Sequence, residues 1–453
     1  MEWVEGVKVS EGRQAPNGFA SRSAAAATAS PRLSAGAWAL LAAFGAIYSF
    51  LYVWQPVTTR AVGGGDFAVY HAAGRALLAG RSPYTVAGFL YPPALSFLFA
   101  PLALLPFRAA WWCWFALGHA AVAWAAWWTT RALGPGPRRW LVVGATWTAG
   151  HALAVSFVEG QVNALLLVAV CLALWPPRRA PWLGPVGAAA AFAIKVWPGV
   201  LWAEDLLLRR WRRLLLSVSL GAALIAVPLA AIACCLRGPL QPPSAAQNFF
   251  GTPAFLNASL PGLALRLSDP PTRGADLPAN WVSGGLLQKL RLSRSDRVLA
   301  VVVSVAALGS GLALLAAALR RRREPPPESW RMGAALVALA LVASPVSWPH
   351  YPVLQLPGTA ALAHELLAAG RWRRLSALAL CFLAVNWTEA LVVGPYVTAY
   401  GIVVSAPAVT WAITTLPVGG GVGLFVLHLL ALRTNRRAGA SAASYAAAAP
   451  AGA

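Results

Sequence analysis

The chain of 453 residues is 58% hydrophobic and only 11% charged, and its mean hydropathy is +0.62. Soluble globular proteins carry about 25% charged residues, so this chain lacks the polar surface needed to cover itself in water. Apolar runs of about 18 residues or more recur, and each can cross a bilayer as a helix. These features exclude a soluble enzyme, a disordered chain and a collagen-like chain, and they predict an all-α polytopic membrane protein.

The basic residues raise nucleic-acid binding as an alternative, because 36 Lys and Arg against 14 Asp and Glu give a formal net charge of +22. They lie in short clusters between apolar runs, rather than along one face or in one tail, so we expect no nucleic-acid partner. The preference of basic residues for cytoplasmic loops explains the charge instead. The five cysteines lie inside apolar segments without CxxC or Cys/His metal spacing, which argues against disulfides and zinc.

The chain divides by composition into two tails, two membrane modules and a long loop. Residues 1–34 are polar and Ala/Ser-rich and are predicted to form a disordered cytoplasmic tail. The first span, Ala35 to Trp54, is too long for a signal-peptide core and has no persuasive cleavage site, so we expect a retained signal anchor. The predicted parts are an N-terminal transmembrane module at 35–236 with a first outer loop at 55–106, a Pro-rich outer loop without a clear fold at 237–297, transmembrane helices at 298–432 and a cytoplasmic tail at 433–453.

Apolar runs predict the spans, and basic clusters predict their orientation. We expect roughly 10–13 transmembrane helices in a plasma-membrane protein with both termini in the cytoplasm. The runs after the first span lie near 89–106, 107–130, 140–158, 163–177, 182–203, 214–236, 298–319, 330–348, 351–369, 375–393 and 402–432. The clusters expected to be cytoplasmic are Arg138/Arg139, Arg178/Arg179, Arg209 to Arg213, Arg320 to Arg323, Arg371 to Arg374 and Arg433 to Arg437.

Two segments must then depart from simple alternation across the membrane. The run at 89–106 contains Pro at both ends and is predicted to be a surface-lying or partly inserted helix. The stretch 182–208 is flanked by Arg on both sides, so it must enter the membrane and return. Trp197-Pro198-Gly199 is the expected tip, because Pro stops a helix and Gly allows a turn. Such hairpins survive in lipid only where they line a protein-enclosed cavity.

Asp66 is one of the few acidic residues, and it stands between Gly63-Gly64-Gly65 and a helical apolar pattern. One interpretation is an N-cap, in which its side chain accepts the unpaired amide hydrogens at a helix start. The other is a general base held in a glycine-hinged loop on the outer face. The local sequence favours the cap, and the two are compatible, because a helix N-terminus also positions a carboxylate accurately.

Three further polar features stand out from the apolar background. Glu159-Gly160-Gln161-Val162-Asn163 joins two apolar runs at the predicted outer side, although an ordinary loop would explain it equally well. Lys195 precedes the predicted hairpin tip, where it either snorkels to the interface or meets an anionic group. His350 ends the segment 344–350 at an outer membrane boundary, where a lone His is more often structural than catalytic.

Several nucleotide and metal motifs are absent from the sequence: it has no DxD triplet, P-loop, GxGxxG or HExxH. Sugar transfer from a nucleotide donor usually needs a soluble α/β domain with a carboxylate-bound metal, and this chain has room for neither. We therefore expect no metal and no cofactor.

The sequence contains an ordered set of short motifs over roughly residues 60 to 355. The motifs are Asp66-Phe67-x-Val69-Tyr70-x-Ala72-Ala73, Leu77-Leu78-x-Gly80-x-x-Pro83-Tyr84, Tyr91-Pro92-Pro93, Pro101-Leu102-x-Leu104-Leu105-Pro106, Gly160-Gln161-Val162-Asn163, Lys195-x-x-Pro198, Asn257-x-Ser259-Leu260-x-Gly262 and Ser344-Pro345-x-Ser347-Trp348-x-His350. Together they resemble glycosyltransferase family 87, although family members often have Gln after the Asn of the motif at Asn257, where this chain has Ala258.

The resemblance implies a GT-C architecture with an extracytoplasmic active site, a polyprenyl-phosphate sugar donor and a lipid-linked or glycan acceptor. It also implies that Asp66 is the base that takes the acceptor proton while the anomeric carbon inverts. The leaving phosphate is already anionic and needs no general acid, but it needs stabilisation, for which Lys195 and His350 are candidates. Further candidates are Tyr70, Glu159, Gln161 and Asn163 for donor contacts and Asn257 for acceptor contacts.

Mannose is the expected sugar, but the sequence does not separate it from arabinofuranose. A flippase or transporter predicts polar residues spread through the spans and repeat symmetry, which the sequence lacks. A non-catalytic relative would leave Asp66 as a cap alone. If the enzyme hypothesis holds, Asp66, Lys195 and His350 should converge on one outward-opening cavity with a lateral lipid gate.

Overall fold

The computed structural model describes residues 34–54, 57, 65–241, 257–268, 294–320, 329–388 and 407–433, and within these ranges every element is helical. The predicted tails at 1–34 and 433–453 lie almost entirely outside the described residues. The elements are α2 (Ala35–Tyr48), η1 (Ser49–Trp54), α4 (Gly65–Leu78), η3 (Pro83–Thr85), α5 (Pro93–Phe99), η4 (Leu102–Leu104), α6 (Phe107–Ala132), α7 (Arg138–Thr148), α8 (Ala152–Val158), α9 (Asn163–Leu174), α10 (Leu183–Ile194), η5 (Trp197–Leu201), α11 (Trp202–Leu207), α12 (Trp211–Cys235), α14 (Leu260–Ser268), α16 (Arg294–Arg320), α17 (Ser329–Ala343), η6 (Tyr351–Gln355), α18 (Leu356–Ala368), α19 (Trp372–Thr388) and α22 (Pro407–Arg433).

Four helical stretches of the described chain are long and apolar enough to cross a bilayer: Ala35–Trp54, α12, α16 and Thr415–Leu432 of α22. Few side chains of α12 and α16 are buried, 17% in the most apolar window of each, so most of their apolar surface faces lipid. The all-α polytopic class is confirmed. The expectation of 10–13 spans exceeds what the described helices support by length and composition, because several apolar runs form short or bent helices.

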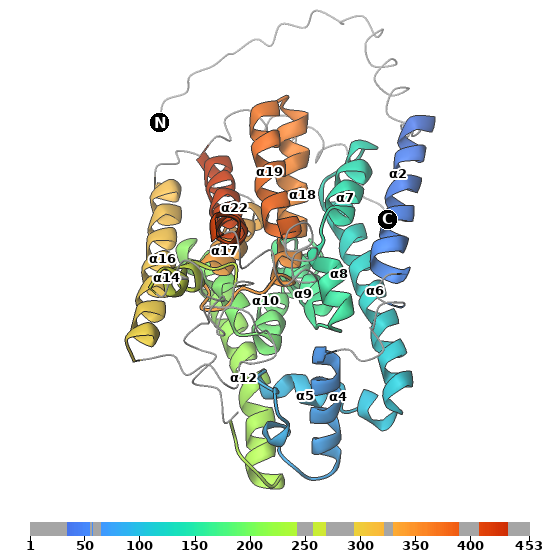
Figure 1. The fold of residues 1–453 in the computed structure, drawn as a ribbon, viewed down its shortest axis with the longest axis vertical. Helices are drawn as coiled ribbons and strands as arrows, with labels where there is room; N and C mark the ends of the chain where they lie inside the picture. The colour runs from blue at the N-terminus through green and yellow to red at the C-terminus, as the bar shows by residue number, and fades with distance from the viewer. Residues whose placement is uncertain are drawn as a thin grey trace, which may run out of the picture.

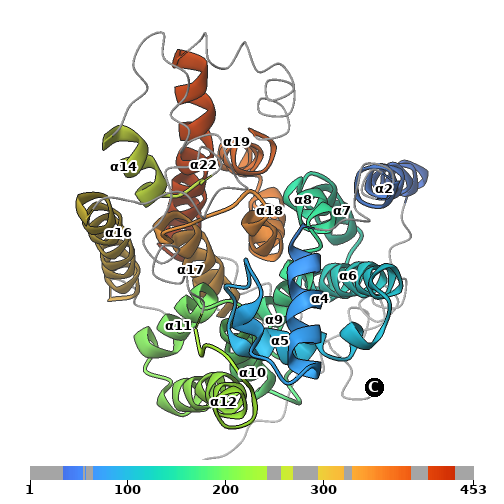
Figure 2. The same cartoon turned by 60° about the horizontal axis from the view of Figure 1, so that its bottom comes forward.

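The core is built on two central helices. In α17 every described residue is buried, and in α9 most are, so neither has a solvent- or lipid-facing side. Helix α9 packs against α6, α10 and α17, and α17 packs against α16, α18 and α22. Figure 2 shows α9 near the middle of the molecule, with α2 and α16 on opposite flanks. An all-round apolar helix is stable only in such a position.

The first predicted outer loop folds into short helices at one end of the molecule. Figure 1 shows α4 and α5 together at the lower end of the long axis, and α7 and α19 reach the upper end. The run at 89–106 forms only α5 and η4, so the prediction that it does not cross the membrane as one helix agrees with the structure. Helices α4 and α5 pack against each other, and α5 also contacts α10 and α12.

The apolar run at 140–158 does not form one straight helix. It forms α7 and α8, which are bent by 55° at the break between them. Backbone groups freed at a break in lipid must find other partners. The hydroxyl of Tyr52 donates to the carbonyl of Thr148 at 2.8 Å, and the indole of Trp387 donates to that of Ala149 at 2.6 Å. The break therefore turns α8 toward α4 without leaving these carbonyls unpaired.

The predicted break near Pro198 is present. Helix α10 ends at Ile194, Lys195 is extended, and Pro198 lies in the first turn of η5. The rings of Phe192 and Trp202 lie 4.4 Å apart, so the chain folds back on itself beyond the break. With 12 residues, α10 rises only about 18 Å, which is less than the bilayer core of about 30 Å. The segment at 237–297 is not wholly without structure, because it contains α14.

We expect Tyr52→Phe to lower the thermal stability of the detergent-solubilised protein by an amount equivalent to about 1 kcal/mol, because it leaves the Thr148 carbonyl without its buried partner. Intrinsic tryptophan fluorescence during a thermal ramp measures the change. An unaltered melting temperature would show that the bend between α7 and α8 does not need this bond.

Candidate functional site

Lys195 is the centre of the polar site. The helix break at the end of α10 gives it an extended backbone, and its side chain is 4% exposed. Its ammonium donates to Gln161 Oε1 at 3.2 Å and to Asn163 Oδ1 at 3.0 Å. Burying a charge is costly unless it is hydrogen-bonded and paired, so these two amide oxygens from the start of α9 are what allow a lysine here.

Aromatic rings complete the surroundings of the ammonium. The Nζ atom lies 4.3 Å from the ring centroid of Tyr351 and 5.6 Å from that of Tyr91. A cation near an aromatic face is attracted by the ring's negative face. Tyr70 joins the same cluster, because its ring lies 4.9 Å from that of Tyr91 and its hydroxyl donates to Gln161 Oε1 at 3.2 Å.

Asp66 lies in the first turn of α4 and faces this cluster. The hydroxyl of Tyr91 donates a hydrogen bond to its carboxylate, and the charge of Lys195 acts on it directly. Burial raises the pKa of Asp66 above its usual range, while Lys195 and the Tyr91 bond lower it in part. The site therefore places a partly buried potential base near the amino group of Lys195.

The N-cap interpretation of Asp66 is wrong. Helix α4 begins at Gly65, so Asp66 is already inside the helix. The backbone amides of Asp66 and Phe67 donate to the carbonyl of Glu159, at 3.0 and 3.2 Å. Another part of the chain thus satisfies amide groups that a helix start leaves unpaired, and the Asp66 carboxylate is left available for chemistry. The Glu159 carboxylate packs against Gly65.

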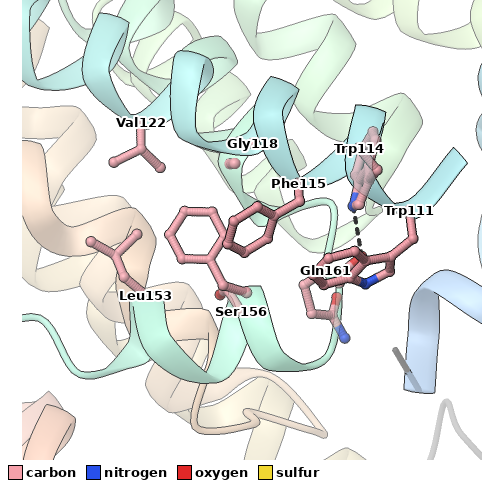
Figure 3. A pocket seen from close by; sticks show the side chains of 11 residues that line it. Trp111, Trp114, Phe115, Gly118, Val122, Leu153, Ser156 and Gln161 are labelled. Carbon is pink, nitrogen blue, oxygen red and sulfur yellow. Dashed lines mark hydrogen bonds between the residues drawn. The ribbon is translucent and has the colours of Figure 1, made fainter. Parts of the chain in front are cut away.

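The turn that holds α4 is itself tightly fixed. Gly160 has a φ of +64°, and a Cβ there would lie 2.6 Å from the Cβ of Phe67, so only glycine fits. The indole of Trp114 on α6 donates to the Gly160 carbonyl at 2.9 Å, the bond drawn as a dashed line in Figure 3. The chain of contacts from α6 through this turn to α4 fixes the backbone that carries Asp66.

His350 is joined to the site mainly through its backbone. Its carbonyl accepts a hydrogen bond from Asn163 Nδ2 at 2.9 Å, and its ring is buried edge-on against that of Tyr351. The charge of Lys195 acts on the imidazole. Asn163 therefore links two of the predicted donor-binding residues, with its oxygen on Lys195 and its nitrogen on the His350 carbonyl.

Asn257 is fully buried and is engaged within the protein. Its amide nitrogen donates to the carbonyl of Pro345 at 3.0 Å, and its amide oxygen accepts from the backbone of Ser347 and the hydroxyl of Ser259, both at 2.8 Å. The structure thus places Asn257 where it holds the segment that leads to His350. An acceptor contact for Asn257 stays a prediction.

A narrow, mostly apolar crevice adjoins the polar cluster. It lies between α6, α8 and the start of α9, and Figure 3 shows Trp114 and Gln161 at one end with Val122 and Leu153 at the other. The crevice shares Gln161 with the Lys195 cluster, whereas Asp66, Lys195 and His350 do not line it. The lateral lipid gate expected from the sequence stays a prediction.

The cluster has few groups that suit a metal or a cofactor. Its carboxylates are Asp66 and Glu159, and no group of three His, Cys, Asp or Glu side chains within the described ranges is placed to hold a metal ion. Its remaining polar groups are amides, phenols, one imidazole and one ammonium, which suit sugar hydroxyls and phosphate oxygens.

The sequence analysis anticipated six members of this cluster and missed others. Asp66, Lys195, Gln161, Asn163, Tyr70 and His350 come together, and Glu159 adjoins them through its backbone. Tyr91 was quoted only as part of a motif, and Tyr351 was not considered although it follows His350. Trp114 carried no local signal, because it is one Trp in a Trp-rich apolar run.

Comparison with known proteins agrees with the motifs. The sequence profile described as glycosyltransferase family 87 matches residues 89–345. The chain belongs to glycosyltransferase family 87. It is therefore a membrane glycosyltransferase. The match includes Gln161, Asn163 and Lys195, whereas Asp66 and His350 lie outside it.

Two proteins from Mycolicibacterium smegmatis (strain ATCC 700084 / mc(2)155) are similar in sequence to this glycosyltransferase. A polyprenol-phosphate-mannose-dependent alpha-(1-2)-phosphatidylinositol pentamannoside mannosyltransferase is 28% identical over 361 residues, which cover 78% of each chain. A polyprenol-phosphate-mannose-dependent alpha-(1-2)-phosphatidylinositol mannoside mannosyltransferase is 27% identical over 333 residues, 66% of this chain and 70% of the relative.

We expect Trp114→Phe to lower the transfer rate about tenfold or more, because losing the bond to the Gly160 carbonyl lets α4 shift, and small misplacements of a reacting group are costly. Steady-state kinetics should show the loss in kcat rather than in the donor KM. Trp128→Phe is the matched control, since it removes an indole bond to the carbonyl of Trp175, outside the site.

The same loss should vanish when Trp114→Phe is combined with Asp66→Asn, because a residue that acts only by positioning Asp66 has nothing left to position. Independent, additive losses in the double variant would contradict this role for Trp114.

Proposed function

We propose that this glycosyltransferase is an inverting mannosyltransferase that uses polyprenol-phosphate-mannose and acts on a lipid-linked or glycan acceptor at the extracytoplasmic side. The observation that carries the proposal is that one partly buried carboxylate, Asp66, lies within electrostatic reach of the buried ammonium of Lys195. The activities named for the two relatives support the donor and the sugar. Their names also favour a glycosylated phospholipid as the acceptor.

Asp66 is the proposed general base. Its carboxylate would accept the proton of an acceptor hydroxyl while that oxygen forms a bond to the anomeric carbon of mannose. The bond between that carbon and the phosphate oxygen breaks on the opposite face, so the configuration inverts and the electron pair leaves with the polyprenyl phosphate. Two features support this role by fixing the carboxylate. One is the hydrogen bond from Tyr91, and the other is the bonding of the first α4 amides to the Glu159 carbonyl.

Lys195 is the proposed electrostatic partner of the leaving phosphate. As the glycosidic bond breaks, negative charge grows on the phosphate, and a preorganised cation at that point lowers the barrier. The amide oxygens of Gln161 and Asn163 hold the ammonium in place before the donor arrives, so little reorganisation is needed. The imidazole of His350, buried behind Tyr351, is the second candidate for this contact.

The remaining polar groups would bind the sugar. Tyr70 and Gln161 share a hydrogen bond, and each retains capacity for a mannose hydroxyl. The rings of Tyr91 and Tyr351 offer apolar faces beside the same point. Glu159 lies close enough to Asp66 to feel its charge, and it is the other acidic side chain available for a sugar hydroxyl.

Location in the plasma membrane, with both termini cytoplasmic, is part of the proposal. The clusters Arg138/Arg139 and Arg209 to Arg213 support a cytoplasmic side by the positive-inside rule. Helix α6 separates the first of these clusters from α5, so the two lie at opposite ends of this 26-residue helix. The site near α4 would then open on the outer side, where the isoprenoid tail of the donor can stay in lipid.

An arabinofuranosyltransferase of the same fold is the alternative that differs only in the donor sugar. Parallel assays of the purified protein with radiolabelled polyprenyl-phosphate-mannose and polyprenyl-phosphate-arabinofuranose separate the two. A flippase or transporter is the alternative of a different class, and it predicts that function survives loss of the Asp66 carboxylate.

We expect Asp66→Asn to fold normally and to lose transfer activity by a factor of about 10²–10⁴, the usual contribution of a general base. The assay is transfer of radiolabelled mannose from polyprenyl-phosphate-mannose in detergent or nanodiscs. Asp296→Asn on α16 is the matched control, because it makes the same isosteric change away from the cluster. Full activity of the Asp66 variant would overturn the base assignment.

The pH profile gives a separate test of the Asp66–Lys195 pair. A base must be deprotonated, so kcat/KM should fall as the pH drops through the raised pKa of Asp66. Lys195→Met removes the charge that partly lowers this pKa, so the pKa should rise further and the acid limb should move to higher pH. Arg212→Gln, which removes a charge at the start of α12, is the control and should leave the acid limb of the kcat/KM profile unchanged. An unchanged acid limb in Lys195→Met would show that Lys195 does not influence the pKa of Asp66.

A further inference from the structure

Two exposed arginines from distant parts of the chain are joined at the end of the molecule that carries α4. Arg81 and Arg237 form a β-bridge. The amide of Ser82 donates to the Arg237 carbonyl at 2.8 Å, and the amide of Arg237 donates to the Gly80 carbonyl at 3.1 Å. The loop after α4 is thus fastened by its backbone to the end of α12, and both guanidinium groups remain exposed.

The fastening leaves little freedom in the spacing of the two arginine backbones. Gly238 has a φ of +123°, and a Cβ there would lie 3.0 Å from Thr85 Cγ2. The hydroxyl of Ser82 also donates to the carbonyl of Pro239. Glycine is needed for this close approach, so the two chain segments hold one register.

The position of α12 places the arginine pair at the level of lipid headgroups. Helix α12 is one of the candidate spans, and apolar side chains such as Leu215 and Val227 are 65% and 68% exposed on it. The helix ends at Cys235, only two residues before Arg237. In the proposed orientation this is the outer end of the span, since the cluster Arg209 to Arg213 stands at its other end. The positive-inside rule therefore does not account for the pair.

A β-bridge sets the two backbones only about 5 Å apart, so both guanidinium groups can reach one anion, and such an anion offsets their mutual repulsion. In the described part of the chain, Arg210, Arg213 and Arg331 form ion pairs with carboxylates, and these ion pairs do not include Arg81 or Arg237. Arginine presents a planar set of donors that matches a phosphate in a bidentate way. At headgroup depth the abundant anion of that shape is the phosphate of a membrane lipid.

We propose that Arg81 and Arg237 bind the phosphodiester of the phospholipid acceptor. The assignment rests on the proposed function, because it places the lipid end of the acceptor whose sugar end meets Asp66. From Asp66 to Leu78 the axis of α4 rises about 18 Å, and Arg81 follows three residues later. An acceptor that reaches from the pair to the base therefore carries several sugars between its phosphodiester and the accepting hydroxyl.

Binding of a defined probe to the full-length protein tests the site without any transfer reaction. The probe is dihexanoyl phosphatidylinositol, titrated by calorimetry into protein in a neutral detergent, with dihexanoyl phosphatidylcholine and inorganic phosphate as comparison ligands. Arg81→Gln/Arg237→Gln should weaken phosphatidylinositol binding about tenfold or more, because each lost charge-assisted hydrogen bond is costly. Arg81→Lys/Arg237→Lys should retain part of it.

Arg131→Gln/Arg212→Gln is the matched control, since it removes two exposed charges elsewhere and should leave binding unchanged. Equal binding in the Arg81/Arg237 variant and wild type overturns the proposal. Competition by inorganic phosphate as effective as that by phosphatidylinositol also overturns it, because the site would then be a general anion site.

Kinetics with acceptors of increasing glycan length then test the distance argument. The acceptor KM should rise in Arg81→Gln/Arg237→Gln most for phospholipids that carry several sugars, with kcat and donor KM unchanged. If no polyprenyl-phosphate sugar is ever transferred, the proposed function fails, yet the phosphatidylinositol titration still reports on the arginine pair. If transfer occurs and Arg81→Gln/Arg237→Gln binds phosphatidylinositol as tightly as wild type, only the arginine assignment fails.

Discussion

The arrangement of the site follows from the cost of burying one ammonium group. Lys195 is almost without exposure, and it is tolerated only because two amide oxygens, two aromatic rings and the charge of Asp66 surround it. These partners come from α4, the segment before α5, the start of α9 and η6, so satisfying this one charge requires four parts of the chain to meet at the end of α10. Burying this one cation therefore also brings the other polar residues of the site together.

Broken helices make that meeting achievable inside an otherwise apolar bundle. Regular helices satisfy their own backbone and present only side chains, whereas the ends of α8 and α10 present carbonyls that other segments can bond, extended residues and turns. The bend between α7 and α8 aims the turn at Gly160 toward α4, and the break after Ile194 brings Lys195 to α9. The hydrogen bonds from Tyr52 and Trp387 limit the energetic penalty of the first break.

Most of the class and much of the site could be predicted from residue patterns, and the limits have physical causes. Apolar length identified the helices, and the scarcity of charge in an apolar chain singled out Asp66 and Lys195, because buried charge is retained only where it is useful or paired. The bend in 140–158 escaped prediction, because the partners that permit it, Tyr52 and Trp387, are about 95 and 238 residues away from it. The capping of α4 was mispredicted for the same reason. The local pattern pointed to Asp66, whereas the distant carbonyl of Glu159 accepts hydrogen bonds from the first amides of the helix.

The docking of α4 onto the carbonyl of Glu159 has a consequence for how this family can diverge. Every amino acid supplies a main-chain oxygen, so the residue at 159 can be exchanged without unfastening the helix, provided that its neighbour stays glycine. The attachment point is thus insulated from mutation while the adjoining side chain is free to drift. New sugar preferences could arise at this position step by step, with the reacting carboxylate kept in place throughout.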